Sequence, residues 1–324
     1  MKKYLLFAAT AFLLNACSQK PAEMTPAIPR NAPIEQKVEN LIKKMSLDEK
    51  IGQMTQLTID VILRQSSDRN PQAPIELDPV RLDSVIRKYK VGSILNVPRS
   101  LPQTPANWNK LIAEIQQAAL AETGIPVIYG VDQIHGASYT VGATFFPQNI
   151  ALGATFNRDL ASVTGQISAY ETKAGGIPWT FAPVLDMGRD PRWPRIWETF
   201  GEDPFVNAEM GAAMVKAFQG SDGSLTDDFH VAACLKHYMG YGVPVTGKDR
   251  TPSRINVQEM REKHFAPFLA AIRSGALSVM VNSGSNNGLP FHADYEHLTQ
   301  WLKEDLNWDG MIVTDWADIN NLFV

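Results

Sequence analysis

The chain has 324 residues, and its 34 acidic side chains outnumber the 30 basic ones, which gives a formal net charge of −4. A nucleic-acid-binding protein would need a strongly basic face, so this balance argues against a nucleic-acid partner. With 44% hydrophobic and 20% charged residues, the composition is that of a globular protein with a large core. The two cysteines, Cys17 and Cys234, are too few for a disulfide framework or a Cys-rich metal site.

The first 17 residues have the pattern of an export signal. Lys2 and Lys3 precede the apolar run 4–14, and Cys17 follows after a small residue. The ending LNAC, residues 14–17, resembles a bacterial lipobox, in which Cys17 would be acylated and would anchor the exported protein to a membrane. The alternative is an ordinary signal peptide with an incidental cysteine. The sequence therefore predicts a lipoprotein signal over 1–17 and a periplasmic or outer-membrane location.

The segment 18–33 is rich in Pro and Ala and predicts a linker ahead of a domain over 34–324. Apolar residues recur at helical spacing from Ile34 to Ile51, and Ser46 with Glu49 forms a capping box, so two helices are expected to open the domain. Beyond them, apolar runs alternate with helical patterns at 108–120 and 259–272. The predicted strands are 91–97, 125–131, 179–185, 231–235, 277–281 and 311–313.

Strands that are apolar on both faces and separated by helices indicate βαβ units and a parallel sheet. Their number and the chain length favour an α/β fold of the (β/α)₈ TIM-like barrel type over a doubly wound sheet. We expect this barrel to be incomplete at the C-terminus, because the chain ends soon after the last predicted strand. No Gly-rich phosphate loop is present, and the six histidines show no metal-binding spacing, so the sequence predicts no cofactor and no metal site.

Polar residues follow the apolar runs at their C-terminal ends. In an α/β barrel these ends meet on one face, where active sites are built. Any one of these residues could cap a turn, but their convergence favours a site. They are Asp132, Asp186, Lys236 with His237, Asn282 with Ser283, and Asp315.

Around these positions the chain resembles the N-terminal barrel of family 3 glycoside hydrolases, the group of bacterial β-glucosidases, exo-β-glucanases and β-xylosidases. The matching segments occur in the order that the family shows. They are GVDQIHG (130–136), TFFPQNIALGATFN (144–157), FAPVLDMGRDPRWPRIWETFGEDPF (181–205), KHYMGYG (236–242), MREKHFAPF (260–268), MVNSGSNNGLP (280–290) and GMIVTDWADI (310–319).

The resemblance implies that Asp315 is the catalytic nucleophile, which attacks the anomeric carbon and forms a covalent glycosyl intermediate with retention of configuration. The alternative for Asp315 is an N-cap of the following helix, a role that Asp318 could take instead. Trp316 is implied as an apolar platform for a sugar face, or else is a core indole.

The resemblance also implies that Asp132, Arg195, Lys236 and His237 bind sugar hydroxyls. Asp132 would accept hydrogen bonds from the hydroxyls, and Lys236 with His237 would donate to them. For His237 alone, a core histidine is the alternative. Pro194 stands before Arg195 where the family has Gly, which makes the shape of this loop a point for the structure to decide.

Three departures from the family pattern matter for function. Ser283 stands where many β-glucosidases have a Tyr beside the nucleophile, so a hydroxyl is kept but its reach is expected to be lost. The Gly-Arg-Asp that the family shows after the Lys-His segment appears here as Gly247-Lys248-Asp249, followed by Arg250. Either Lys248 or Arg250 could therefore meet the sugar or an acidic neighbour. Tyr241 stands where the β-N-acetylhexosaminidase branch has its catalytic His, which makes that branch a minor alternative.

In the β-glucosidase branch the acid/base is a Glu of a C-terminal domain, which we expect to be missing from this chain. The chain is thus expected to carry the nucleophile and sugar pocket of a retaining exo-acting β-glucosidase, and to be inactive by itself on natural β-glucosides. The alternatives are a β-xylosidase or other exo-β-glycosidase of the same family, a lipid-anchored protein that binds glycans without turnover, and an aldolase-like barrel with Lys236 as Schiff-base residue.

Overall fold

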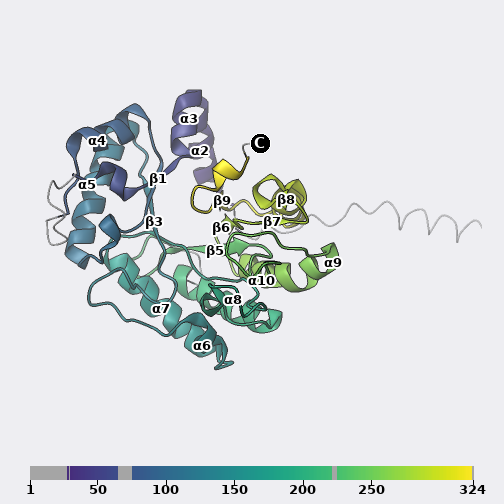
Figure 1. Ribbon diagram of the computed structural model, residues 1–324. Helices are drawn as coiled ribbons and strands as arrows, with labels where there is room; N and C mark the ends of the chain where they lie inside the picture. The colour runs from purple at the N-terminus through teal and green to yellow at the C-terminus, as the bar shows by residue number, and fades with distance from the viewer. Residues whose placement is uncertain (1–27, 29, 65–74, 221–224, 323–324) are drawn as a thin grey trace, which may run out of the picture.

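The computed structural model describes residues 28, 30–64, 75–220 and 225–322. Within these ranges seven strands form one parallel sheet in which neighbours follow chain order, and the helices lie on its outer side (Figure 1). This is the α/β barrel architecture that the sequence predicts, and β1 and β9 form the two edges of the sheet. The strands are β1 (Gln56–Thr58), β2 (Ser93–Leu95), β3 (Ile128–Val131), β4 (Trp179–Thr180), β5 (Ala232–Tyr238), β6 (Ser278–Val281) and β9 (Met311–Val313), with a separate hairpin of β7 (Ser285–Asn286) and β8 (Leu289–Pro290).

Helices connect successive strands, as parallel pairing requires. Some of the described helical segments are π-helical or 3₁₀ turns rather than α-helices. The α-helices are α2 (Ala32–Lys44), α3 (Leu47–Gln53), α4 (Pro79–Asp83), α5 (Pro105–Thr123), α6 (Asn149–Gly153), α7 (Arg158–Ala174), α8 (Pro204–Gln219), α9 (Val257–Glu259) and α10 (Phe265–Arg273). The π-helical segments are η2 (Ser84–Lys88), η5 (Met260–His264) and η7 (Glu296–Asp305). The 3₁₀ turns are η1 (Ile59–Ile62), η3 (Pro98–Ser100), η4 (Ile196–Glu198), η6 (Phe291–Ala293) and η8 (Asp318–Leu322).

Local sequence signals explain where these helices begin and end. The predicted capping box is present, because the Ser46 side chain accepts from the Glu49 N–H and the Glu49 side chain accepts from the Ser46 N–H. Thr104 caps α5 ahead of Pro105 at the first helical position. Helix α5 ends at Gly124, which adopts a left-handed φ of 69°.

The hydrophobic core is divided between the two halves of the sheet. One cluster joins β1, β2 and β3 to α5, and a larger one joins β5 and β6 to α7, α8 and α10. A third, small cluster of Trp179, Phe181, Cys234 and Met280 lies where β4, β5 and β6 meet. Gly130 is required beside it, since a Cβ there would lie 2.5 Å from the Phe181 ring. The interior beside β3 and β4 is therefore tightly packed.

The predicted elements largely coincide with the observed ones, but the predicted strand 179–185 is shortened to β4, Trp179–Thr180, and the hairpin of β7 and β8 was not predicted. Further differences concern β1, β5 and α2. Strand β1 has no counterpart in the prediction. Strand β5 extends to Tyr238, so Lys236 and His237 lie within the strand rather than after it. Helix α2 begins at Ala32, inside the predicted linker 18–33. The signal segment 1–17, with Cys17, lies outside the described residues, as does most of that linker.

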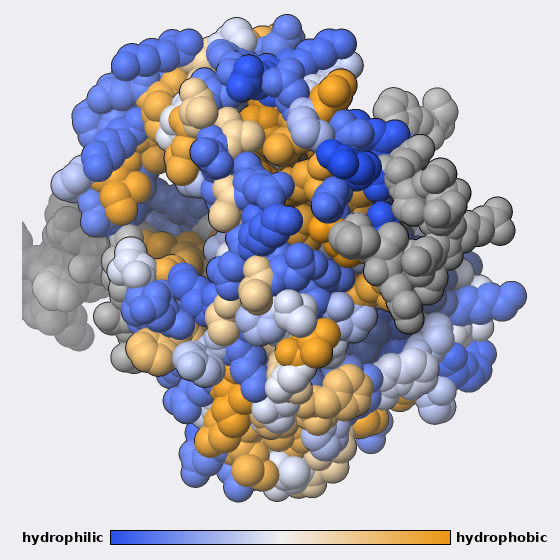
Figure 2. Space-filling model, turned by 90° about the vertical axis from the view of Figure 1, so that its left-hand side faces the viewer, coloured by the Kyte–Doolittle hydropathy of each residue, from blue (hydrophilic) through white to orange (hydrophobic). Residues whose placement is uncertain are grey.

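The face seen in Figure 2 carries mainly hydrophilic side chains interspersed with hydrophobic patches, as is usual for a solvated surface. Within the ranges that the structure describes, no helix combines the length and apolar character needed to cross a bilayer.

Candidate active site

The polar residues that follow the apolar runs do converge. Asp132 comes directly after β3, His237 is the penultimate residue of β5, Ser283 follows β6, and Asp315 lies two residues beyond β9. Side-chain contacts link neighbouring strand ends, His237 with Asp186 and Ser283 with Asp315, and Lys236 of β5 reaches past β4 to Asp132 after β3. The expectation that strand-end side chains lie together is confirmed, because parallel strands place all their carboxyl ends at one edge. Asn282 is the exception, since its amide bonds the Met239 carbonyl and the Gly284 N–H and so shapes a turn.

Both carboxylate oxygens of Asp315 accept hydrogen bonds. Its Oδ1 accepts from Arg250 Nη2 at 3.1 Å and from the Trp316 backbone N–H at 2.5 Å, and its Oδ2 accepts from the Ser283 hydroxyl at 2.7 Å. The side chain is 12% exposed. The Ser283 hydroxyl thus reaches Asp315, contrary to the expectation that its reach would be lost, because β6 and β9 are paired neighbours.

The charge state of Asp315 follows from these contacts. Burial acts to raise the pKa of Asp315, but hydrogen bonds from Trp316 and Ser283 and the charges of Arg250 and Lys236 outweigh it. The pKa of Asp315 therefore lies below its ordinary value. At neutral pH this side chain is a carboxylate, the state that a nucleophile needs.

Lys236 and Asp132 form an ion pair across the end of the sheet. The Lys236 side chain is almost fully buried, whereas the Asp132 side chain keeps 38% of its surface exposed. A buried ammonium needs such a partner, because an unpaired charge in the interior is strongly unfavourable. Asp132 thereby remains open to further hydrogen bonds on its exposed side.

His237 pairs with Asp186, which ends the segment after β4. Asp186 Oδ2 lies 2.7 Å from His237 Nδ1 and accepts the His237 backbone N–H at 3.1 Å. The other ring nitrogen, Nε2, lies 3.7 Å from Asp315 Oδ2. His237 is therefore part of the polar network of the site rather than an isolated core histidine, and its partner Asp186 was recognised in the sequence only as a strand-end residue.

Arg195 is held by a bidentate ion pair with Glu198, with both N–O distances at 2.8 Å. Although burial opposes its charge, this ion pair holds the pKa of Arg195 above its usual value. Its guanidinium lies over the Tyr241 ring at 5.8 Å from the ring centre, and Tyr241 also packs edge-on against His237. Arg195 thus borders the strand-end network through Tyr241. Its predicted contact with sugar hydroxyls stays a prediction.

Of Lys248 and Arg250, it is Arg250 that meets acidic neighbours, whereas a contact of either residue with a sugar stays a prediction. Lys248 is exposed, whereas Arg250 bridges Asp315 and Asp318, bonding Asp318 Oδ1 at 2.9 Å. Asp318 is 2% exposed and serves as a second anchor for the guanidinium. The turn after β9 brings both aspartates to the same guanidinium, whereas the sequence had suggested only a capping role for Asp318.

Trp316 is 52% exposed, so its indole is not a core residue. Its backbone N–H holds Asp315 while its side chain faces solvent. Of the two alternatives for Trp316, an apolar surface beside the carboxylate is the one compatible with this exposure.

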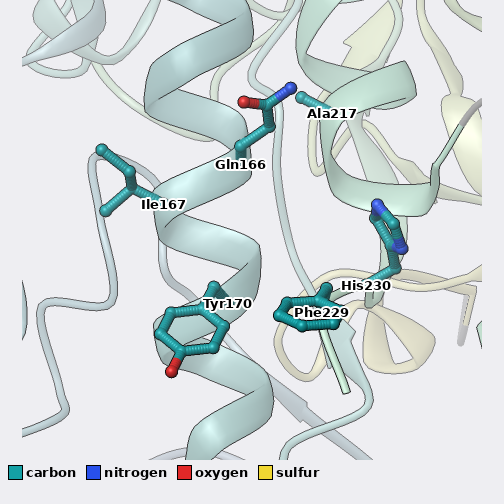
Figure 3. A pocket seen from close by; sticks show the side chains of 6 residues that line it. All are labelled: Gln166, Ile167, Tyr170, Ala217, Phe229 and His230. Carbon is teal, nitrogen blue, oxygen red and sulfur yellow. The ribbon is translucent and has the colours of Figure 1, made fainter. Parts of the chain in front are cut away.

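A separate hollow of about 500 Å³ lies on the outer layer, between α7 and α8. Figure 3 shows Tyr170 of α7 beside Phe229, with the two rings stacked at 5.8 Å between centres. None of the predicted site residues lines it; its lining consists of Gln166, Ile167, Tyr170, Ala217, Phe229 and His230. Within the described ranges, no group of three or more His, Cys, Asp and Glu side chains is arranged to hold a metal ion.

Comparison with known proteins identifies the relatives of this arrangement. The sequence matches the family described as "Glycosyl hydrolase family 3 N terminal domain" over residues 46–324. The chain is 42% identical over 298 residues to the lysosomal beta glucosidase of Dictyostelium discoideum, covering 88% of this chain and 35% of that protein. It is 28% identical over 331 residues to a putative beta-xylosidase of Formosa agariphila, covering 100% of this chain and 42% of that protein.

Among solved structures, the exo-1,3/1,4-beta-glucanase of a Pseudoalteromonas species superposes with a TM-score of 0.78 at 34% identity. The alignment covers 91% of this chain and 36% of that enzyme. These matches confirm the resemblance inferred from the motifs and the barrel fold. The chain spans about a third of the length of the glucosidase and glucanase that it matches.

Proposed function

Because the chain belongs to glycosyl hydrolase family 3, we propose that it supplies the nucleophile and the sugar pocket of a retaining, exo-acting β-glucosidase. The observation that carries the proposal is Asp315, a carboxylate with a lowered pKa at the end of a barrel strand, held by Ser283 and Arg250. Retaining hydrolysis needs an ionised carboxylate that attacks the anomeric carbon and leaves again on hydrolysis.

In the proposed reaction, Asp315 forms a bond to the anomeric carbon while the glycosidic oxygen departs and takes up a proton from a separate acid. Water then attacks the same carbon and releases Asp315 and the sugar. Asp132, Lys236 and His237 hold the sugar hydroxyls; in support, Lys236 pairs with Asp132 at the strand ends and His237 Nε2 lies 3.7 Å from Asp315 Oδ2. The acid is proposed to be a Glu from a second domain, as the resemblance implies.

A covalent trap tests this proposal directly. A 2-deoxy-2-fluoroglucoside with a dinitrophenyl leaving group forms the glycosyl ester but hydrolyses it slowly, and the departing phenolate needs no acid. We expect mass spectrometry of the digested protein to find the sugar on the peptide that contains Asp315. A protein that binds glycans without turnover would carry no adduct.

The matching mutation is Asp315→Ala in the full-length protein. Loss of a covalent nucleophile is expected to reduce kcat on an aryl β-glucoside by about 10⁴-fold or more. Asp309→Ala is the control, because Asp309 forms an exposed ion pair with Arg30 and lies on the loop before the same strand. Near-wild-type activity in Asp315→Ala would refute the assignment.

A β-xylosidase is the second candidate, and the observation that favours it is the match to the putative beta-xylosidase of Formosa agariphila along the whole chain. The two sugars differ only in the hydroxymethyl group on C5. The ratio of kcat/KM for nitrophenyl β-glucoside and β-xyloside decides between them, and we expect it to favour the glucoside.

A further inference from the structure

Asp186 and His237 form a buried pair beneath the strand-end face. The exposed fraction of the two side chains is 0% for Asp186 and 1% for His237. One carboxylate oxygen, Oδ2, contacts both the ring Nδ1 and the backbone N–H of His237. The opposite ring nitrogen, Nε2, faces Asp315 at 3.7 Å. The imidazole thus connects a carboxyl group that is sealed from water with the proposed nucleophile.

The number of protons on this pair decides what Nε2 can do. The other Asp186 oxygen, Oδ1, has no hydrogen-bond partner among the described residues, so a full negative charge on Asp186 would be poorly stabilised. A proton shared between Oδ2 and Nδ1 removes that cost. Whichever of the two atoms carries the shared proton, Nε2 then keeps an N–H of its own.

The surroundings of the pair agree with this proton count. Burial raises the pKa of Asp186 to about 8 and lowers the pKa of His237 below its usual value. The nearby cations favour loss of the shared proton, but burial outweighs them. The charged and titratable groups that face the pair are Arg195, Glu198, Lys236, Tyr241, Arg250 and Asp315.

We propose that Asp186 is a positioning residue, which makes His237 a hydrogen-bond donor at Nε2 toward a substrate hydroxyl that Asp315 also contacts. The inference rests on the proposed function, because it assigns the hydroxyl to a sugar bound at Asp315. An oxygen about 2.8 Å from both Nε2 and Asp315 Oδ2 is compatible with their separation. Such a hydroxyl accepts from Nε2 and donates its single proton to the carboxylate.

Without the N–H on Nε2 this arrangement fails. The hydroxyl would face two acceptors with one proton, and one acceptor would remain buried and unpaired. Above about pH 8 the pair loses its shared proton, His237 keeps its remaining proton on Nδ1, and Nε2 becomes an acceptor. Binding of the sugar is therefore expected to weaken as the pH rises through this value.

Nitrogen NMR of the ¹⁵N-histidine-labelled chain without ligand tests the proton count. The His237 signals are assigned by their absence in His237→Gln. We expect Nε2 to be protonated at about pH 7 and to lose its proton on titration to about pH 9.5, with a midpoint near 8. An unprotonated Nε2 at about pH 7 overturns the proposal.

Asp186→Asn tests the consequence for binding. The amide oxygen is expected to replace Oδ2 as acceptor of the His237 backbone N–H, so the ring proton moves to Nδ1 and Nε2 loses its N–H. Calorimetric titration with glucose should then show an affinity about 10- to 100-fold lower than wild type. The alkaline loss of binding should be absent, because the amide has no proton to release.

The control is Asp294→Asn, which alters a similar buried pair, Asp294 with His297 at 2.6 Å, outside the strand-end network. It should leave glucose binding and its pH dependence unchanged. Wild-type binding and pH dependence in Asp186→Asn contradict the proposal. A wild-type chain that fails to bind glucose contradicts the proposed function instead. In that case, and also if Asp186→Asn does not fold, the NMR titration of the wild-type chain still decides the protonation of His237.

Discussion

Among single residues, the few groups that contact Asp315 determine the chemistry of the site. Arg250 contributes a charge-assisted hydrogen bond to Asp315 and is itself anchored by Asp318, which is almost fully buried. Charged hydrogen bonds of this kind are stronger than neutral ones. Arg250 therefore both orients the carboxylate and favours its ionised form, without having to touch the anomeric carbon.

Replacement of this arginine should alter the pH dependence of the proposed activity. Arg250 lowers the pKa of Asp315, so Arg250→Gln raises it. Because only ionised Asp315 is nucleophilic, the loss of kcat/KM at acidic pH is expected to begin at a higher pH than in wild type. The pH–rate profile on an aryl β-glucoside measures the shift.

Arg254→Gln is the matched control, since Arg254 lies on the same loop and is exposed to solvent. Its profile should coincide with that of wild type. An unchanged acidic limb in Arg250→Gln would show that the Arg250–Asp315 contact does not govern ionisation of the nucleophile.

At the scale of elements, close approaches of the backbone hold the short strands in register. Helix α3 rests on the segment that leads into β2, and Gly52 marks the contact. A Cβ at Gly52 would lie 2.1 Å from the carbonyl oxygen of Tyr89. The Gly52 carbonyl also accepts from the Gly92 N–H at 3.0 Å, one residue before β2 begins. The contact therefore positions β2 relative to the first helices.

Gly52→Ala is expected to destabilise the fold even though Ala is the better helix former. The change from Gly to Ala gains about 1 kcal/mol in helix propensity. Overpacking against a backbone that cannot move aside typically costs about 1–3 kcal/mol, so we expect a net loss in the free energy of unfolding. Urea unfolding followed by circular dichroism measures the difference. Lys50→Ala in the same helix is the control, and equal stability of Gly52→Ala and wild type would show that the backbone moves aside freely.

At the scale of the whole molecule, the carboxyl groups gathered at the strand ends already have roles that keep them from acting as the acid. Asp132 pairs with Lys236, Asp186 is sealed beneath His237, and Asp315 is the proposed nucleophile. A natural sugar leaving group needs a proton, a contribution of about 10²–10⁴ in rate. The proposed acid therefore has to come from residues outside this network.

We accordingly expect the 324-residue chain by itself to act on a dinitrophenyl β-glucoside but not on cellobiose. The dinitrophenolate leaves without a proton, so it isolates the nucleophilic step. Product release is followed by absorbance and by glucose detection. Hydrolysis of cellobiose by the purified chain at the rate of a complete family enzyme would place an acid within these residues.

Membrane attachment through Cys17 is a separate proposal about the whole molecule, and it concerns a residue outside the described ranges. Metabolic labelling with a lipid precursor should tag the protein, and Cys17→Ser should move it to the soluble exported fraction. Several acyl chains on one residue suffice for stable anchoring. A wild-type protein without label would leave the ordinary signal peptide as the explanation.

Local sequence patterns were enough to predict the barrel class, most strand positions and the polar side chains that gather at the strand ends. These follow from local patterns: apolar runs of strand length, a capping box at Ser46, and polar residues directly after strands. Strand β1 was missed because its sequence, Gln56–Thr58, contains a single strongly apolar residue. Its strand character comes from pairing with β2, which no local pattern reports.

The partners of these side chains, by contrast, depend on how the chain folds. That Arg250 rather than Lys248 meets Asp315, that the Ser283 hydroxyl reaches it, and that Asp186 lies under His237 are contacts between residues 32 to 65 positions apart in the chain. Such contacts depend on which strands are neighbours and on how each loop turns back over the strand ends. Residue type and spacing determine that a carboxylate stands at a strand end, whereas its protonation and orientation are set by the groups that the fold packs against it.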